Sequence, residues 1–233
     1  GHALLTAEPF VEGEFIVLNG DDIYSKENIQ KAMERKPSVL AKEVQDPERF
    51  GIWLEKDGFV SGFQEKPGRP ESSLANLGLF VLPREVFDHI RKTGKSVRGE
   101  YELNEAVHSL SKEIPVRVVR VEDGWQPVGY PWHILEANRL VLRGLGNSIE
   151  GGVEEGATVK GPVHIGRGSK VMAGAYIEGP VYIGENCTIR PNCFIRPNVS
   201  LGDGCLIGNA CEVKNLVTGD NTKIPHLSYV SDS

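Results

Sequence analysis

An aliphatic residue returns at every sixth position over the last third of the chain. A helix repeats every 3.6 residues and a sheet strand every two, so neither accounts for a period of six. A coil of three short flat faces does account for it, because each face points one aliphatic residue inward and each corner is a tight turn that Gly or Asn can make. Eighteen residues then complete one coil, and each coil pairs its backbone with the next. The aliphatic positions are Val153, Val159, Ile165, Val171, Ile177, Ile183, Ile189, Ile195, Leu201, Ile207 and Val213.

This period predicts a left-handed parallel β-helix of hexapeptide repeats over residues 147–233. Small or β-branched residues stand two positions before the aliphatic ones, and the four Cys residues share this column. We expect small buried thiols that fill a narrow interior. A disulfide or metal site is the alternative, but no CxxC motif supports it. The four are Cys187, Cys193, Cys205 and Cys211.

Size and composition limit the classes of function. The chain has 233 residues, of which 39% are hydrophobic and 25% charged, which is typical of a folded protein of one large or two modest domains. The net charge of −6 argues against nucleic acid as a partner. No apolar run approaches the roughly 20 residues of a membrane span, and no signal-peptide pattern opens the chain. We therefore expect a cytoplasmic protein without a membrane partner.

Residues 1–146 have the alternating strand and helix patterns of an α/β domain, which is typical of a Rossmann-like sheet. A Gly-rich stretch with Gly144 and Gly146 marks the boundary before the repeat. Lys56-Asp57-Gly58 predicts a hairpin turn, and Ser25 can cap the helix that follows it. The expected strands cover 15–18, 38–44, 51–54, 60–64, 76–82 and 116–121, and the expected helices cover 26–35, 84–92, 102–112 and 131–142.

Two carboxylates, Asp21 and Asp22, follow directly after the first expected strand. Ligands of α/β sheets collect at the carboxyl ends of strands, and carboxylate oxygens suit Mg²⁺. An Asp pair in this position is also common as a turn or helix cap. The pair taken alone leaves both interpretations open.

A series of short motifs, none of them strong alone, resembles the sugar-1-phosphate nucleotidyltransferase family in order and spacing. With the β-helix behind them, the chain is similar to the archaeal-type bifunctional uridylyltransferase/acetyltransferases and to the glucose-1-phosphate thymidylyltransferases of that family. The resemblance covers nearly all of the chain. The motifs are Gly1-His2-Ala3-Leu4, Val17-Leu18-Asn19-Gly20-Asp21, Phe63-Gln64-Glu65-Lys66-Pro67, Asn76-Leu77-Gly78, Gly99-Glu100-Tyr101-Glu102-Leu103 and Val128-Gly129-Tyr130-Pro131-Trp132.

The resemblance implies nucleotidyl transfer from UTP or dTTP to a sugar 1-phosphate, either glucose 1-phosphate or N-acetylglucosamine 1-phosphate, with release of pyrophosphate. Asp21 matches the family's Mg²⁺ ligand, and Lys66 matches a position near the phosphate. Gly51, Glu65 and Asn76 match sugar-contacting positions. A solvated strand end is the alternative for Glu65-Lys66-Pro67. The resemblance identifies neither the nucleobase nor the sugar.

Two departures from the family pattern bear on activity. The family's Gly-rich triphosphate loop, which precedes the segment matching Gly1 to Leu4, does not occur in the sequence. Pro127 stands where relatives often carry a second metal-binding Asp, two residues after Trp125. We therefore expect that this polypeptide does not carry out nucleotidyl transfer unaided, and that both ends are cuts in a longer protein.

The hexad register breaks after Val213, and we expect a loop from Lys214 to Pro225. His226 then matches the family's acetyltransferase base, which would take a proton from a sugar amine before it attacks acetyl-CoA. Arg196, Lys214 and Tyr229 stand at matching offsets, the two cations for the sugar phosphate. An inert, exposed His is the alternative.

The resemblance also implies a homotrimer, since such β-helices associate around a three-fold axis with acyl sites between neighbours. A different class of function remains open. The chain could be a catalytically inactive assembly or sugar-nucleotide-binding subunit whose β-helix serves oligomerisation, and the missing triphosphate loop and Pro127 favour this alternative.

Overall fold

The computed structural model describes residues 1–95, 99 and 101–233, which form two compact units. The first unit runs from Gly1 to Trp125 and the second from Gln126 to Ser233. Glu100, which belongs to one of the motifs above, lies outside the described residues. In the described part of the chain, no helix is long and apolar enough to cross a membrane.

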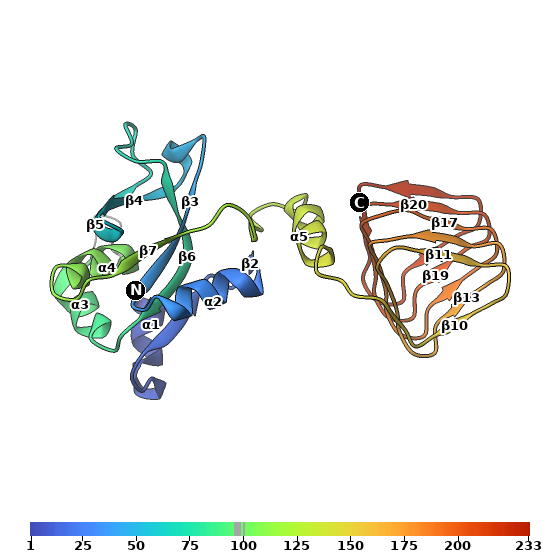
Figure 1. Cartoon of the computed structure of the whole chain (residues 1–233), viewed down its shortest axis with the longest axis horizontal. Coiled ribbons are helices and arrows are strands. Elements are labelled where there is room, and N and C mark those ends of the chain that lie inside the picture. The colour runs from blue at the N-terminus through green and yellow to red at the C-terminus, as the bar shows by residue number, and fades with distance from the viewer. Residues whose placement is uncertain (96–98, 100) are drawn as a thin grey trace. The chain divides into compact units, whose positions relative to one another are not determined.

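A mixed six-stranded sheet forms the centre of the first unit, in the order β1-β6-β3-β7-β5-β4 (Figure 1). Its pairs are antiparallel except for β3 and β7, which are parallel. The hairpin turn between β4 and β5 is confirmed, with positive φ at Asp57 and Gly58. The strands are β1 (Phe15–Leu18), β3 (Ser38–Glu43), β4 (Gly51–Lys56), β5 (Phe59–Glu65), β6 (Leu74–Leu82) and β7 (Arg117–Arg120).

Helices cover both faces of this sheet. On one face, α3 (Val86–Thr93) and α4 (Leu103–Ser111) pack on a core that includes Trp53 and Phe80. On the other face, α2 (Lys26–Glu34) packs through Ala32 on a second core. Ser25 caps α2 as predicted, because its Oγ accepts a hydrogen bond from the Asn28 backbone N–H at 3.2 Å.

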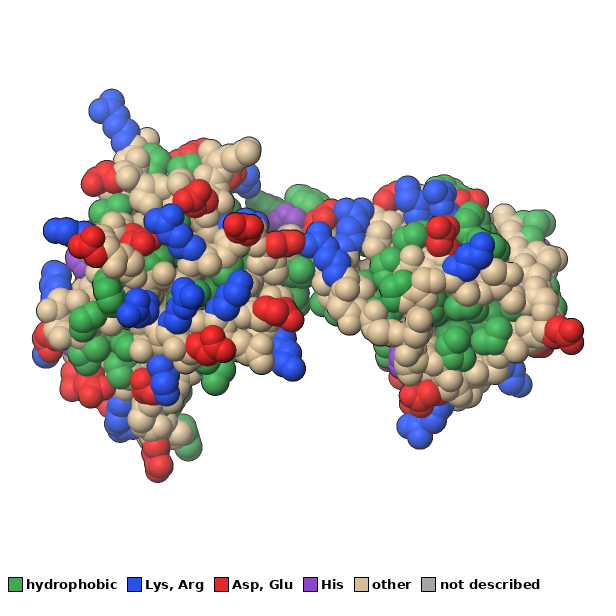
Figure 2. Space-filling model, in the orientation of Figure 1, with side chains coloured by type: hydrophobic (Ala, Val, Ile, Leu, Met, Phe, Trp, Pro, Cys, Tyr) green, Lys and Arg blue, Asp and Glu red, His purple; other side chains and the backbone are tan. Residues whose placement is uncertain are grey.

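The shorter helices and strands were not predicted from the sequence, because each contains too few residues to show a periodic pattern. They are α1 (His2–Ala7), the 3₁₀ turns η1 (Glu8–Phe10) and η2 (Pro47–Arg49), β2 (Asp22–Tyr24) and β8 (Trp125–Pro127). Figure 2 shows positive and negative side chains interspersed over the visible face of the first unit. That face therefore carries no large field of one sign.

A bulge interrupts β6 where it pairs with β3. Val39 pairs with Phe80 and Ala41 pairs with Asn76, so between these two pairs β6 contains more residues than β3. Gly78 lies in the bulge with a φ of 70°, and a Cβ at this position would collide with the side chain of Asn19. The bulge thus requires a glycine, and it allows the segment after β1 to approach β6.

The repeat folds into a parallel β-helix with three five-stranded sheets (Figure 1). From β10 to β20, strand partners lie 18 residues apart, as in Ile177 and Ile195, which confirms the predicted coil length. The strands are β9 (Ser148–Ile149), β10 (Gly152–Val153), β11 (Thr158–Lys160), β12 (Val163–Ile165), β13 (Lys170–Val171), β14 (Tyr176–Glu178), β15 (Val181–Ile183), β16 (Thr188–Ile189), β17 (Phe194–Ile195), β18 (Val199–Leu201), β19 (Leu206–Ile207), β20 (Glu212–Lys214), β21 (Leu216–Val217), β22 (Lys223–Ile224) and β23 (Tyr229–Ser231).

The sixth-position residues from Ile165 to Val213 are fully buried inside the coils. Burial of each aliphatic side chain contributes roughly 1.5–3 kcal/mol. Corner residues take the left-handed conformation that the sequence predicted for Gly or Asn, with φ between 55° and 66° at Asn186, Asn192 and Asn198. The six-residue repeat therefore predicts both the flat faces and the corners of the β-helix, which has the form of a three-sided prism.

The expected loop from Lys214 to Pro225 is wrong. Leu216 pairs with Val199 and Ile224 pairs with Ile207, so the coil continues through this segment. These partners are 17 residues apart, because one corner is a residue shorter than the corner below it. A single deleted corner residue shifts the hexad in the sequence without interrupting the strand ladder.

The four cysteines are free and buried, as predicted. Each thiol donates to a backbone carbonyl of the next coil, for example Cys193 Sγ to Gly208 O at 2.8 Å and Cys211 Sγ to Pro225 O at 2.9 Å. The Ser169 hydroxyl occupies the same column and donates to Gly184 O at 2.7 Å. This column therefore satisfies carbonyl groups at the corners as well as filling space.

Helix α5 (His133–Leu142) packs on the β-helix within the second unit. Asn138 Nδ2 donates to Asn198 O at 3.0 Å and its Oδ1 accepts from Ser200 Oγ at 2.6 Å. Arg139 Nε donates to Asn215 Oδ1 at 3.2 Å. Because α5 packs on the β-helix, the boundary between the two compact units lies before α5. The Gly-rich stretch at 144–146 lies after this helix.

Candidate functional site

The three predicted sugar-contacting residues lie on one face of the sheet. Gly51 pairs with Glu65 across β4 and β5, and Ile52 pairs with Ala75, which places Gly51 beside Asn76 of β6. Side chains alternate along a strand, so Gly51 and Glu65 share the face of Trp53 and Phe63, which α3 and α4 cover. The three positions come from separate stretches of sequence, and the sheet brings them together.

Gly51 leaves space that other side chains fill. A Cβ at this position would meet the Phe63 ring and would lie 3.1 Å from Glu65 Oε2. The Glu65 carboxylate thus extends over the Gly51 backbone, and a side chain at position 51 would displace it. The close approach of Phe63 and Glu65 thus requires Gly at position 51.

Lys66 begins the segment that follows β5. Its φ is 42°, and its backbone N–H donates to Phe50 O at 3.1 Å. Gln64 holds the far end of this segment, because its amide exchanges two hydrogen bonds with Glu71, at 2.7 and 3.1 Å. Both contacts fix the backbone on either side of the exposed Lys66 side chain.

Asn76 is held in one orientation at the start of the bulge. Its Oδ1 accepts from the Gly78 backbone N–H at 3.0 Å, and its Nδ2 donates to Asn104 Oδ1 at 2.9 Å. Asn104 lies in the first turn of α4 and was not identified from the sequence, although it directly follows the motif that ends at Leu103. Only the tertiary contact reveals it.

The two carboxylates after β1 have different surroundings. Asp22 Oδ2 accepts from Trp125 Nε1 at 3.1 Å, from the Tyr24 hydroxyl at 3.2 Å and from Asn19 Nδ2 at 3.3 Å. Asp21 is exposed. Asp22 therefore fixes the turn, and Asp21 is the carboxylate whose oxygens can face a ligand.

Tyr24 reinforces this turn on the α2 side of the sheet. Its hydroxyl lies 2.6 Å from Leu77 O, at the bulge. Burial raises the pKa of the Tyr24 hydroxyl well above its usual value, and the Asp22 carboxylate raises it further. The phenol stays protonated as a donor. Tyr24 and Trp125 were not identified as positioning residues, although Trp125 belongs to a motif noted in the sequence.

The bulge links the carboxylate turn with Asn76. The Asn19 backbone N–H donates to Gly78 O at 3.1 Å, and Asp21 follows two residues later. The network around Asp22 lies on the α2 side of the sheet, whereas Asn76, Gly51 and Glu65 lie on the α4 side. Asp21 lies three residues after the last residue of the edge strand β1, Leu18.

One Asp is compatible with Mg²⁺ only if a substrate contributes further ligands. No group of three or more His, Cys, Asp or Glu side chains in the described residues could hold a metal by itself. Mg²⁺ is commonly bound through one or two carboxylates together with substrate phosphates and water. The donor set at Asp21 fits that mode. Pro127, in β8, offers no side-chain ligand.

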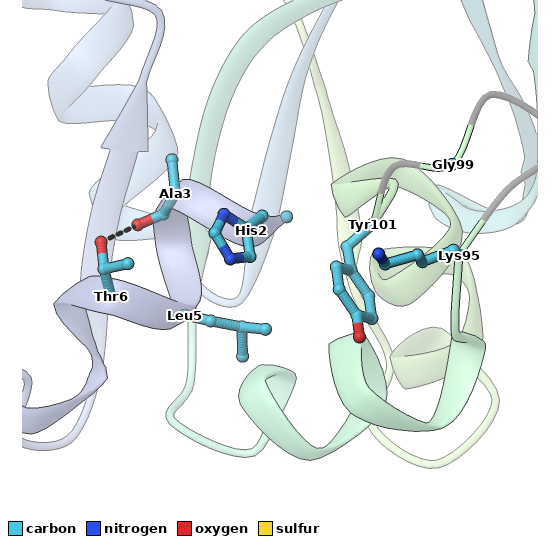
Figure 3. Close-up of a pocket in the computed structure, with 8 residues that line it drawn as sticks. His2, Ala3, Leu5, Thr6, Lys95, Gly99 and Tyr101 are labelled. Carbon is cyan, nitrogen blue, oxygen red and sulfur yellow. Dashed lines mark hydrogen bonds between the residues drawn. The ribbon is translucent and has the colours of Figure 1, made fainter.

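A cavity of about 840 Å³ lies between the first helix and the segment before α4 (Figure 3). It brings the first motif, at His2 and Ala3, together with the motif that contains Gly99 and Tyr101. The His2 ring stacks on Tyr101, with 6.3 Å between their centroids, and the Lys95 ammonium lies 5.9 Å from the centre of the same ring.

In the β-helix, His226 lies at a corner of the coil instead of a loop. Its neighbours on the coils below are Asn209 and Arg190, and together with Leu227 they line a hollow of about 440 Å³. The His226 side chain is exposed. Arg190 and Asn209 were not identified from the sequence, because the coil spacing that would have revealed them changes from 18 to 17 residues just before His226.

The two predicted phosphate-binding cations lie at another corner. Arg196 and Lys214 stack on adjacent coils, since Ile195 pairs with Val213. Arg196 Nη1 lies 2.9 Å from Glu212 Oε1, and its guanidinium lies 5.8 Å from the centre of the Phe194 ring. One face of the prism separates this corner from His226, and Tyr229, which is 61% exposed, projects from that face. The structure thus brings Arg196 and Lys214 together but leaves His226 apart from them.

Comparison with known proteins gives two family matches. Residues 1–144 match the nucleotidyl transferase family, and residues 162–197 and 180–215 match the bacterial transferase hexapeptide family. The chain is 42% identical over 234 residues to the bifunctional protein GlmU of Methanocaldococcus jannaschii, covering 100% of this chain and 57% of that protein. It is 33% identical over 179 residues to a glucose-1-phosphate thymidylyltransferase of Streptomyces antibioticus, covering 73% of this chain and 50% of that one.

Two solved structures are similar to this chain over part of its length. One, described as a glucose-1-phosphate thymidylyltransferase from Bacillus anthracis in complex with sucrose, has a TM-score of 0.52 and 28% identity, covering 63% of this chain and 62% of its own. A UTP-bound UGPase from Acinetobacter baumannii has a TM-score of 0.50 and 22% identity, covering 61% of this chain and 55% of its own. The chain spans about half the length of the curated relatives it matches.

Proposed function

Because the chain belongs to the nucleotidyl transferase family, we propose that its first unit serves nucleotidyl transfer from UTP or dTTP to a sugar 1-phosphate. The substrate would be glucose 1-phosphate or N-acetylglucosamine 1-phosphate. The observation that carries the proposal is the gathering of Gly51, Glu65 and Asn76 on one face, beside the turn that presents Asp21. These are the positions at which the sequence resembles the family's sugar and metal site.

In this reaction, a phosphate oxygen of the sugar 1-phosphate attacks the α-phosphorus of the nucleoside triphosphate, and pyrophosphate leaves. Such transfers depend mainly on placing the phosphates and neutralising their charge. Glu65 would accept hydrogen bonds from sugar hydroxyls, and Lys66 would offset charge on the sugar phosphate. Bound at Asp21, Mg²⁺ would supply charge neutralisation between the phosphates. Asp22 would hold Asp21 in place through the fixed turn.

The β-helix would serve acetyl transfer from acetyl-CoA to an amino-sugar 1-phosphate. His226 would take a proton from the sugar ammonium, since only the neutral amine attacks the thioester. Because one face of the prism separates His226 from Arg196 and Lys214, a compact site would combine one corner with a neighbouring chain. This supports the proposal of a homotrimer with sites between subunits. Arg190, in the same hollow as His226, adds a cation for a phosphate of acetyl-CoA. A cytoplasmic location fits these substrates.

The test uses the protein as its gene encodes it, with each pairing of UTP or dTTP with glucose 1-phosphate or N-acetylglucosamine 1-phosphate and Mg²⁺. Pyrophosphate release is the measurement, and we expect it for at least one pair. No release with any pair would refute the proposal. Calorimetric binding of a sugar nucleotide without turnover would instead favour the inactive binding subunit, which no observation of the structure supports.

Asp21→Asn tests the metal role within the same assay. The variant keeps the size of the side chain but loses its charge, so we expect kcat to fall by roughly 100-fold or more and the Mg²⁺ requirement to rise. Asp57→Asn is the matched control, because Asp57 is an exposed Asp in the hairpin turn, where Asn also adopts positive φ. An equal loss in both variants would contradict a role specific to Asp21.

A further inference from the structure

The hydrogen bonds of Asn76 fix the orientation of a second amide. The Gly78 backbone N–H can only donate, so the atom of Asn76 that faces it is the oxygen, at 3.0 Å. The nitrogen of Asn76 therefore faces Asn104, and the contact at 2.9 Å requires the oxygen of Asn104. The Asn104 nitrogen then points away from Asn76 and has two N–H groups for other partners.

Asn104 lies on the same side of the sheet as the proposed sugar-binding residues. It is half-buried in the first turn of α4, and this helix packs through Ala106 and Val107 on the core that contains Trp53. Asn76 belongs to the same face and stands beside Gly51. The pair of amides thus extends the site from the sheet onto a helix.

We propose that Asn104 is a sugar-specificity residue that donates an N–H to the acetamido carbonyl oxygen of the substrate. This rests on the proposed nucleotidyl transfer. Since Asn104 accepts from Asn76, it presents only donors on its other side. A donor-only group favours a substrate with an oxygen in that position over one with an ammonium group there.

Asn104→Asp is the discriminating variant. A carboxylate can still accept from Asn76 Nδ2, so the contact between β6 and α4 is retained, but the two donors are lost and an acceptor faces the substrate. The experiment measures KM for each substrate, with N-acetylglucosamine 1-phosphate and glucosamine 1-phosphate compared at a fixed nucleoside triphosphate. Lys112→Gln is the control, because it changes the net charge equally at the exposed end of α4.

We expect Asn104→Asp to raise KM for N-acetylglucosamine 1-phosphate by roughly 10- to 100-fold and to leave KM for the nucleoside triphosphate unchanged. The ratio of kcat/KM for the acetamido sugar over the amino sugar should fall at least about 10-fold. Lys112→Gln should change neither. Asn104→Ala, which loses the donors without adding charge, should raise the same KM by a smaller factor.

Several outcomes would overturn the inference. If Asn104→Asp has wild-type KM values and an unchanged substrate ratio, Asn104 only supports the fold. If KM for both substrates rises together with a loss of thermal stability, the effect is structural. Turnover by the wild-type protein with an unaffected Asn104→Asp variant refutes this inference alone, whereas a wild-type protein without pyrophosphate release refutes the proposed function on which it rests.

Discussion

The two units of the chain build their candidate sites by different means. In the β-helix, every outward residue has a place given by its position in the coil, and Arg196 and Lys214 meet because they are one coil apart. In the α/β unit, Asn76 meets Asn104 and Asp22 meets Trp125 across long stretches of sequence. In the periodic β-helix, the sequence position of a residue is thus enough to predict its neighbours. In the α/β unit, the neighbours depend on a bulge in β6 and on how the helices pack on the sheet.

The largest effect should come from His226→Ala, which tests whether the corner position is functional. If His226 is the base, loss of its imidazole should lower acetylation of glucosamine 1-phosphate by roughly 10²–10⁴-fold and leave pyrophosphate release unchanged. His164→Ala is the matched control, because this second outward His of the β-helix stacks on Tyr182 away from the hollow. Acetylation at the wild-type rate in His226→Ala would show that His226 has no role in acetyl transfer.

Ile195→Ala tests whether the coil depends on its inner column. Ile195 is fully buried, so the variant leaves a cavity and should lower the free energy of unfolding by about 2–5 kcal/mol, measured by urea denaturation. Thr188→Ala, on an outward position of β16, should change it by less than about 0.5 kcal/mol. Similar values for both would contradict the assignment of inward and outward positions.

Gly78→Ala tests whether the α/β site depends on the bulge. A Cβ at a φ of 70° collides with Asn19, so we expect a loss of about 1–3 kcal/mol in unfolding free energy and a raised KM for the sugar 1-phosphate. Gly68→Ala is the control, since nothing lies within 4 Å of a Cβ there. An unchanged KM in Gly78→Ala would separate the bulge from substrate binding.

The smallest effect concerns pH and the cysteine column. Burial raises the pKa of the Cys187 and Cys193 thiols, so the folded protein retains protons that the unfolded chain releases near pH 9. Their contribution to stability is complete below that pH and decreases as the pH rises through the folded-state pKa, by at most about 1 kcal/mol for each thiol at pH 9.5.

Urea unfolding under reducing conditions at pH 7.5 and 9.5 measures this decrease. The double variant Cys187→Ser, Cys193→Ser should show a smaller pH dependence, because a hydroxyl can donate to the same carbonyls without titrating in this range. A pH dependence as steep as that of the wild-type protein would assign the effect to other groups.

The sequence by itself determined the β-helix, its inner column and the burial of its cysteines, because a period of six leaves one arrangement that buries the aliphatic residues. It also identified β1, the hairpin after β4 and the cap at Ser25, which depend on neighbouring residues. The sequence misjudged the segment after Val213, because one deleted corner residue shifts the count but not the ladder.

Only the tertiary structure decided which residues surround the candidate sites. Asp22 fixes the turn and Asp21 remains exposed because Tyr24 and Trp125 donate hydrogen bonds to Asp22. No local sequence pattern connects these residues. The orientation of Asn104 depends on a backbone N–H in a bulge of another element. Hydrogen bonds between distant segments form only after the sheet and helices have packed, so the order of residues along the chain does not contain them in readable form.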